Sequence, residues 1–325
     1  MAFLRDIGRR ESDRAAQAFA LLLSQSALFR TFENADGFQL AATDHILEPV
    51  DDTAATQGRA LGGGFTRAAL SRASRPTTTL AIQGDAVSLD VAYQRDIENG
   101  LLNMDAWLER RMNRRIRSWV RSLEAKYFNG NPGTTATDPK GFKTLLDGAT
   151  ALPGFAGNTG TIDATTVAGT NELDLTSSTN YDALLEAFEQ WTVVNVPNAS
   201  AIFCSPKTAA RLTTIAHLKR ILGEDRDQFG NPVKTFNGIA IVPTVPTAIL
   251  HTEPNKNASA TTSTSIYIAR IGEGDTSLLT NGFDFWDHNE PIDENKISNG
   301  LTWEFRGQIA AESPDAIARV MYLKV

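Results

Sequence analysis

The stretch that decides the fold is DAWLERRMNRRIRSWVRSLEAKYFNG, residues 105–130, which places six arginines in the thirteen positions from Glu109 to Arg121. The apolar residues in and just before this stretch recur every three or four positions, the spacing of one face of an α-helix. They are Leu101, Met104, Leu108, Met112, Ile116, Trp119, Val120, Leu123 and Tyr127. Because NGNP at 129–132 is a strong stop signal, we predict one helix over 101–128, about 42 Å long at 1.5 Å per residue.

The arginines fall between the apolar positions, so they are expected to project from the other faces of the helix. A helix that reads DNA usually comes with a helix-turn-helix pattern, zinc-ligand spacing or a basic tail, and the sequence has none of these. We therefore predict a structural helix whose charges face water or other subunits. A DNA-binding protein that uses the arginine-rich helix 105–121 is the alternative from another class.

The overall charge is acidic but uneven. The 325 residues carry a formal net charge of −7 and a pI near 5.2, which excludes a surface built as a whole for nucleic acid. Residues 105–130 are net positive, whereas residues 131–325 hold 22 acidic against 14 basic side chains. This asymmetry suggests that copies of the chain meet through opposite charges. At 42% hydrophobic residues, the chain can bury a sizeable core in one or two domains.

Cysteine usage and apolar runs exclude several classes of protein. Cys204 sits in the apolar run ASAIFCSP and is interpreted as a core residue. Because it is the single cysteine of the sequence, a disulfide scaffold and a cysteine-based zinc site are excluded. The longest apolar run is too short to span a bilayer. Asp6, Glu11 and Asp13 interrupt the N-terminal stretch, so it does not resemble a secretory signal. We expect a soluble protein with no membrane partner.

The search for catalytic chemistry is negative. The sequence contains no phosphate-binding glycine loop, no nucleophile elbow and no HExxH motif. The four histidines (His45, His217, His251 and His288) lie far apart, and none has another histidine or cysteine at ligand spacing. No spacing singles out a nucleophile with its base. We expect no enzyme activity, no metal and no cofactor.

The first third of the chain contains few elements that could fold alone. Residues 12–29 are predicted as one amphipathic helix with Ser12 as its cap. TTTLAI (77–82) and AVSLDVAY (86–93) are predicted as strands joined by a hairpin turn at 83–85. An isolated hairpin is marginal in water, so this one must lean on another element.

The rest of the chain mixes helices and strands. We predict helices in NYDALLEAFEQWTVV (180–194) and after Ser205, the latter with Ser205 as cap and Pro206 in its first turn. Strands are predicted in ASAIFCS (199–205), on both sides of a turn at Asn237-Gly238, in SIYIARI (265–271) and along the tail 301–323. The fold class is α+β.

The order of these pieces resembles the major capsid protein of tailed bacteriophages, whose fold is shared by encapsulin shells. Residues 101–128 resemble that family's spine helix, and YDALLEAFEQWTVVNVPNASAIFCSPKTAARL (181–212) is similar to its helix, strand and "SP-T" helix unit. DQFGNPVKTFNGIAIVPT (227–244) resembles its hairpin signature, although alanine stands at 240 where proline is common. SIYIARIG (265–272) and LTWEFRGQIAAESPDAIARV (301–320) resemble its terminal strands. The resemblance covers nearly the whole chain from about residue 10.

The resemblance implies a phage major capsid fold and a division of the chain. The expected parts are an N-terminal arm (1–52), an extended loop or E-loop (53–95), a peripheral domain with the spine helix (96–175), an axial domain (176–285) and return strands of the peripheral domain (286–325). The short arm leaves no room for the long helical scaffolding segment of many family members. The scaffold is therefore expected to be a separate protein, and removal of a few N-terminal residues stays open.

The implied function is structural. The chain would be a subunit of an icosahedral virion capsid, assembled in the host bacterial cytoplasm from hexamers and pentamers, that encloses packaged double-stranded DNA. Its partners would be its own copies, the scaffolding protein, a portal and, by weak non-specific contact, DNA; a decoration protein stays open. The alternative within the same fold is an encapsulin-type compartment enclosing a cargo enzyme.

Some capsids of this family join the E-loop to a neighbour through a lysine–asparagine bond, but the first lysine here is Lys126, so the E-loop cannot supply one. Four arginines of the loop are the candidates for contact instead, because their planar forks suit carboxylates at interfaces. They are Arg59, Arg67, Arg72 and Arg75, and the candidate acceptors are Asp284, Asp287, Glu290, Asp293 and Glu294, or Glu224, Asp225 and Asp227. We expect a capsid without covalent crosslinks; arginines that only keep the loop soluble are the alternative.

Overall fold

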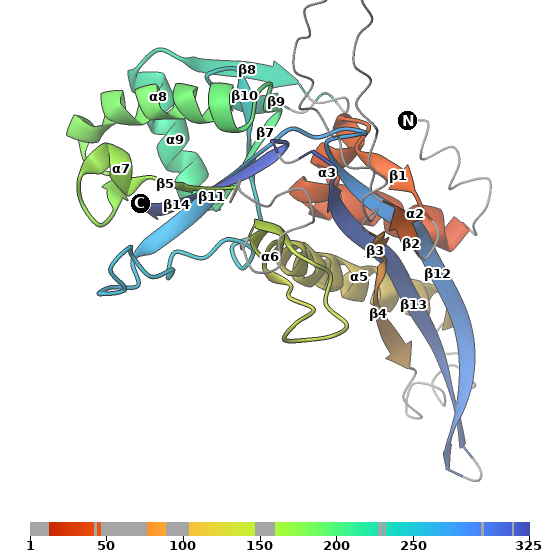
Figure 1. The fold of residues 1–325 in the computed structure, drawn as a ribbon. Coiled ribbons are helices and arrows are strands. Elements are labelled where there is room, and N and C mark those ends of the chain that lie inside the picture. Colours follow the sequence, from red (N-terminus) through yellow and green to blue (C-terminus); the bar gives the residue numbers. More distant parts are fainter. Residues whose placement is uncertain are drawn as a thin grey trace, which may run out of the picture.

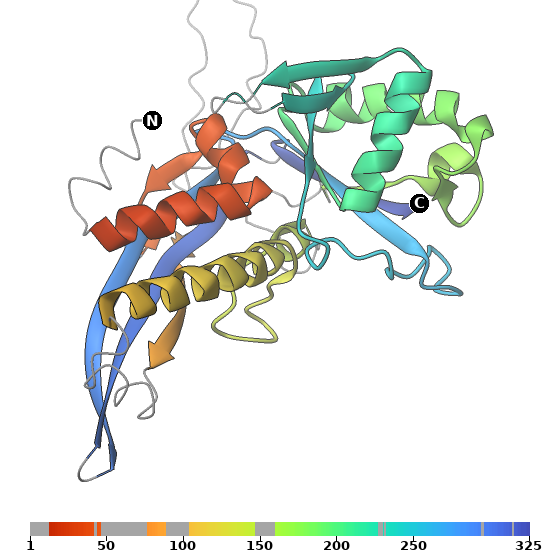
Figure 2. The same cartoon turned by 180° about the vertical axis from the view of Figure 1, so that it is seen from behind.

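The computed structural model describes residues 13–41, 44–46, 77–88, 104–146, 160–226, 230, 232–293, 296–313 and 315–325. Figures 1 and 2 show two parts, one around an eight-stranded sheet and one around a four-stranded sheet. Helices α2 (Asp13–Gln25) and α5 (Met104–Asn129) lie across one face of the four-stranded sheet. A long β-hairpin of that sheet projects away from both parts (Figure 1).

Helix α5 is the predicted arginine-rich helix, and its described range agrees closely with the predicted one. Five members of the apolar stripe are buried as expected, with at most 3% exposure, and Trp119 is half-buried. The five are Met112, Ile116, Val120, Leu123 and Tyr127. Leu101 lies outside the described residues. All six arginines of the helix lie on its exposed surface. The 3.6-residue period therefore predicted both the helix and the face that it buries.

The predicted single helix over 12–29 is wrong, because the chain forms two helices there. Helix α2 ends at Gln25, and α3 (Ala27–Asn34) begins after it. Ser26 between them has extended backbone angles (φ −115°, ψ 124°), and its Oγ accepts a hydrogen bond from the Phe29 amide at 3.3 Å. A serine cap that satisfies the first amides of a new helix lets the chain turn at this point.

The four-stranded sheet has the order β1-β12-β13-β4. Its elements are β1 (Phe38–Leu40), β12 (Thr276–Asp293), β13 (Lys296–Ala311) and β4 (Ala81–Ser88). β12 and β13 pair antiparallel along their whole length, which confirms the long strands predicted for the tail. β1 covers β12 only at 278–280 and β4 covers β13 only at 300–307, so the rest of the hairpin continues as two strands.

The predicted hairpin turn at 83–85 is wrong. β4 runs straight through these residues and pairs with β13, while β3 (Thr77–Thr79) pairs with β2 (Asp44–Ile46). Gly84 marks a close approach rather than a turn, because a Cβ at this position would lie 2.4 Å from the Trp303 carbonyl oxygen. The expectation that this segment leans on another element is confirmed by its pairing with β13.

The eight-stranded sheet carries the other helices. Its strands are β5 (Thr161–Asp163), β14 (Ile317–Lys324), β11 (Ser263–Ala269), β7 (Ala201–Cys204), β10 (Ile239–Pro243), β9 (Pro232–Phe236) and β8 (Leu222–Arg226) in this order, with β6 (Leu173–Asp174) also on β14. The helical elements are α6 (Phe142–Leu146), α7 (Thr165–Ala168), a 3₁₀ turn (Ser178–Asn180), α8 (Tyr181–Gln190), a π-helix (Trp191–Asn195) and α9 (Pro206–Leu218).

Two local predictions in this part are confirmed. Ser205 caps α9, its Oγ accepting from the Thr208 amide at 3.2 Å. Asn237 and Gly238 both have positive φ (50° and 81°), as a tight hairpin turn between β9 and β10 requires.

The predicted range 286–325 contributes to both sheets, since β13 lies in one and β14 in the other. The division of the chain into domains stays a prediction.

We predict that Gly84→Ala lowers the free energy of unfolding by about 1–3 kcal/mol, because the new methyl group would press on the Trp303 carbonyl and force β4 from β13. The matched control is Ala86→Val, an exposed position two residues along the same strand, which is expected to stay within about 0.5 kcal/mol of wild type. Urea denaturation measures both. Equal stabilities for the two variants would contradict the close approach.

Candidate functional site

The outer face of α5 carries a concentration of positive charge. Four of its arginines follow each other at steps of four, three and four residues, which places them on one line along the helix. They are Arg110, Arg114, Arg117 and Arg121, and we call them the arginine row. None of the four forms a hydrogen bond or ion pair in the part of the chain that the structure describes. In Figure 2 the α5 ribbon lies in front of the sheet.

The flank of α5 holds β4, which belongs to the predicted E-loop range. The Arg115 Nε atom lies 2.7 Å from Asp85 Oδ2, and Lys126 Nζ donates to Gln83 Oε1 at 2.7 Å. Partial burial pushes the pKa of Asp85 upward, but hydrogen bonds from Arg115 and the Ala86 amide outweigh it, so the pKa lies below its usual value. Two polar contacts thus anchor the end of this loop to the helix.

The projecting hairpin carries most of the acidic residues proposed as acceptors. Asp284 Oδ2 lies 3.4 Å from Arg306 of the paired strand, so this carboxylate already has a partner within the subunit. Asp287, Glu290 and Asp293 lie further along β12. The four arginines Arg59, Arg67, Arg72 and Arg75, together with Glu294 and Asp227, lie outside the described residues. Glu224 and Asp225 are exposed on the edge strand β8.

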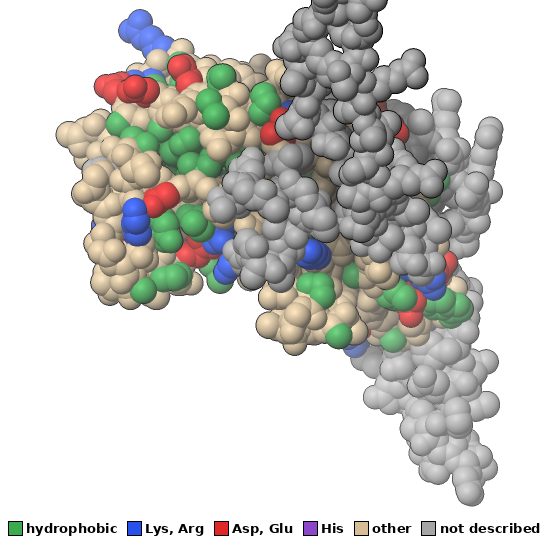
Figure 3. Space-filling view, in the orientation of Figure 1, with side chains coloured by type: hydrophobic (Ala, Val, Ile, Leu, Met, Phe, Trp, Pro, Cys, Tyr) green, Lys and Arg blue, Asp and Glu red, His purple; other side chains and the backbone are tan. Residues whose placement is uncertain are grey.

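Several large apolar side chains are exposed. Val193 and Val194 in the π-helix are 72% and 67% exposed, and Leu218 at the end of α9 is 60% exposed. Trp286 in the projecting hairpin is 42% exposed. Figure 3 shows hydrophobic side chains gathered over the part that contains α8, with charged groups around them. Such positions are candidates for contact with other proteins.

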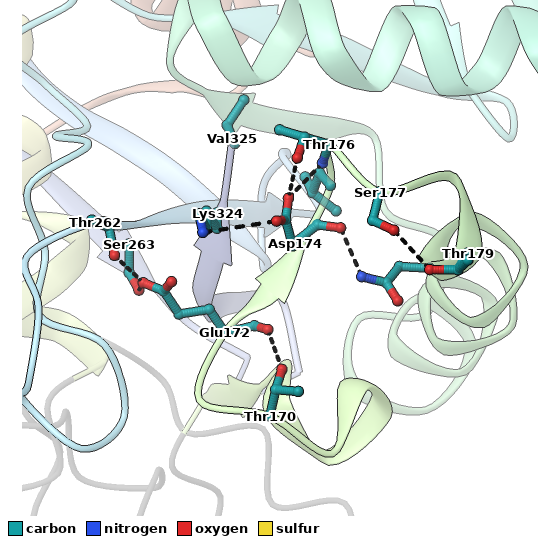
Figure 4. Close-up of polar contacts among 12 residues, drawn as sticks. Thr170, Glu172, Asp174, Thr176, Ser177, Thr179, Thr262, Ser263, Lys324 and Val325 are labelled. Atoms are coloured by element: carbon teal, nitrogen blue, oxygen red, sulfur yellow. Dashed lines mark hydrogen bonds and ion pairs between the residues drawn. The ribbon is translucent and has the colours of Figure 1, made fainter.

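A polar network joins the 170–180 segment to the C-terminal strand (Figure 4). Glu172 Oε1 accepts from the hydroxyls of Thr262 and Ser263 at 2.5 and 2.6 Å, and Asp174 lies 3.8 Å from Lys324 Nζ. Partial burial pushes the pKa of Asp174 upward, but hydrogen bonds from Thr176 and the nearby cations outweigh it and lower the pKa. These carboxylates are satisfied within the chain, so the network is structural.

The residues with catalytic character also have structural roles. Ser205 Oγ lies 2.6 Å from His251 Nε2, but Ser205 is 1% exposed and caps α9, so a substrate cannot reach it. Burial raises the pKa of the Cys204 thiol, which keeps it protonated and confirms its place in the core. Among the described residues, no three His, Cys, Asp or Glu side chains gather as metal ligands. None of the described helices has the length and apolar character that crossing a membrane requires.

One residue that the sequence interpretation missed is Glu124, a buried carboxylate where three parts of the chain meet. It comes from α5, its Oε1 accepts from the Val245 amide at 2.9 Å, and it lies beside Ser26 at the α2–α3 break. Burial raises the pKa of Glu124, and the neighbouring hydroxyl, amides and Arg30 offset this only in part. Its spacing from Val120 and Tyr127 placed it at the edge of the apolar stripe, which was the available signal.

The comparisons with known proteins identify the fold. The chain is similar to the holo-SrpI encapsulin complex from Synechococcus elongatus PCC 7942 (TM-score 0.55, 10% identity, 88% of this chain and 85% of that chain). It is also similar to the capsid of a native GTA particle (0.54, 14%, 91% and 90%) and to the satellite phage P4 procapsid that includes size determination (Sid) protein (0.51, 10%, 92% and 98%). The sequence itself matches no family model and no curated protein.

The chain therefore has the α+β fold that phage capsid proteins share with encapsulins, as the sequence resemblance predicted. The likeness extends over most of the chain, so it includes both sheets and α5 rather than one local unit.

The buried carboxylate leads to a pH prediction. The pKa of Glu124 is raised in the folded state. Glu124 therefore makes its full contribution to the free energy of unfolding below its unfolded-state pKa of about 4.3. This contribution is lost as the pH rises through the folded-state pKa. Relative to Glu124→Gln, the wild type should lose stability over this rise in pH. Thermal unfolding of both proteins across the pH series measures the difference, and a difference that stays constant would contradict the assignment.

Proposed function

We propose that this chain is the major capsid subunit of a tailed phage. It assembles with its own copies into hexamers and pentamers of an icosahedral virion shell, in the host bacterial cytoplasm, around packaged double-stranded DNA. A separate scaffolding protein and a portal take part in this assembly. The observation that supports the proposal most strongly is the likeness of about nine-tenths of the chain to shell subunits, among them a phage procapsid and a GTA capsid.

Features of the single subunit point the same way. The hairpin β12–β13 extends past both neighbouring strands, although a two-stranded hairpin alone is marginal in water. The hairpin also exposes a tryptophan, exposed valines lie elsewhere on the surface, and the arginine row has no partner among the described residues. In a shell, neighbouring subunits contact each subunit at several edges, and such surfaces would be buried in these contacts. A closed shell is built from heterologous contacts whose rotations close on themselves.

The encapsulin compartment remains the second candidate, because one of the similar structures is an encapsulin complex. The contents of the particle separate the two functions. A shell that encloses double-stranded DNA fits the capsid, whereas a shell that copurifies with one enzyme in a fixed ratio fits the compartment. Neighbouring genes separate them too, since terminase, portal and tail genes accompany a capsid gene.

The assembly prediction is direct. Expression of the full chain in bacteria, alone and with its scaffolding protein, should yield closed icosahedral shells in electron micrographs, with hexamers and pentamers at lower concentration. Each contact between subunit edges is weak, but many such contacts act together, so the closed shell is the stable product. A protein that stays monomeric in every condition, with scaffold supplied, would contradict the proposed function.

We further propose that E-loop arginines join neighbouring subunits without covalent bonds. Arg59→Glu, Arg67→Glu, Arg72→Glu and Arg75→Glu together should abolish shells while the melting temperature of the subunit stays near the wild-type value. The matched control replaces the same four arginines by lysine, which keeps the charge and should retain assembly in part. Wild-type shells should run as one band on a denaturing gel. A ladder of linked oligomers, or shells formed by the glutamate variant, would refute this contact.

A further inference from the structure

The arginine row on α5 is a straight line of four cations that have no hydrogen-bond or ion-pair partner among the described residues. At 100° per residue its members fall within an arc of about 60°, on the side of the helix turned away from the buried stripe. From Arg110 to Arg121 the row spans about 16 Å at 1.5 Å per residue. Arg115, by contrast, lies outside this arc and is engaged with Asp85. The row is therefore not part of the polar contacts between the described residues of the subunit.

Packing of α5 does not require these arginines. The buried face of the helix is complete without them, since Ile116 and Val120 are fully buried and face α2 and the sheet. Four like charges at helical spacing repel each other and destabilise an isolated helix by a few tenths of a kcal/mol per pair. A ligand with regularly spaced negative charges would remove this repulsion, and arginine forks bind phosphate oxygens in pairs.

Helix α8 of a second copy is a poorer match for the row. Helix α8 carries Asp182, Glu186 and Glu189 at steps of four and three residues, the spacing that would face the row best. Asp182, however, is already paired with Lys219, which leaves two carboxylates for four arginines. Duplex DNA carries one negative charge per about 1.7 Å of its axis, so a row of this length meets more phosphates than it has arginines.

We propose that the arginine row binds the phosphate backbone of double-stranded nucleic acid, without reading its sequence. This inference rests on the proposed function, because enclosed DNA is the partner that would lie along the row. It also implies that the outer face of α5 is turned toward the contents of the shell. The net charge of −7 confines attraction to such local faces, so the contact is weak and gives way at moderate salt.

The test measures duplex binding by the unassembled full-length subunit. Fluorescence anisotropy with a labelled 25-base-pair duplex is followed from about 50 to 200 mM salt, where four phosphate contacts should weaken binding about 100-fold. The variant Arg114→Gln, Arg117→Gln and Arg121→Gln retains Arg110 alone of the row. It should bind more weakly at low salt and lose only about fourfold over the same range.

The matched control removes three exposed cations elsewhere, Arg220→Gln, Arg226→Gln and Lys234→Gln, and so makes the same change in net charge. It should retain the wild-type salt dependence, because general repulsion from DNA rises equally in both variants. Circular dichroism confirms that α5 folds in all three proteins. Equal losses in the two variants would overturn the proposal, since binding would then follow net charge rather than the row.

Failure of this inference and failure of the proposed function are distinguishable. If wild-type shells form but the α5 variant binds duplex DNA with wild-type affinity and salt dependence, the row does not bind nucleic acid and an acidic protein surface becomes its occupant. If no shells form, the binding measurement still stands on the free subunit. Shells of the α5 variant should also retain less nucleic acid from the expression host than shells of the control variant.

Discussion

The constraint on which the rest of the structure depends is that the central strands of the eight-stranded sheet are buried on both faces. Along β7 and β11, Phe203 and Tyr267 enter one core, while Ile202 and Ile268 enter the other. Helices α8 and α9 supply the second core. The end of α5 closes the first core, where the Phe128 ring centroid lies 5.8 Å from that of Phe203 and 5.5 Å from that of Tyr267. Apolar burial on both faces therefore joins the two parts and directs α5 away from the shared sheet.

The distribution of charge follows from that arrangement. Once the apolar stripe of α5 is covered by α2 and the four-stranded sheet, the arginines can only occupy the flank or the outer face. The flank uses Arg115 and Lys126 to hold β4, which belongs to the loop proposed to reach a neighbouring subunit. The outer face retains four arginines with no partner in the described chain. The contacts with the rest of the subunit and the arginine row thus lie on different sides of one helix.

Sequence reasoning succeeded where a local pattern and the final packing agree. The period of α5, the Ser205 cap and the Asn237-Gly238 turn are each decided by a few neighbouring residues, and the structure confirms them. It failed at Ser26 and Gly84. A serine inside a helical pattern and a glycine inside a strand pattern each allow two local structures, and distant residues choose between them. Glu124 was missed because its partners lie on other segments of the chain.

By itself, the sequence determined which residues turn inward, since the spacing of apolar side chains sets the buried face of a helix before any partner is known. It also determined that no lysine lies in residues 53–95, which excludes a bond to a lysine of that range. Only the tertiary structure decided that β4 joins β13, that β14 leaves β13 for the other sheet, and which arginines of α5 stay unpaired. Strand pairing and ion pairs join residues far apart in the chain, and their geometry exists only after the cores have formed.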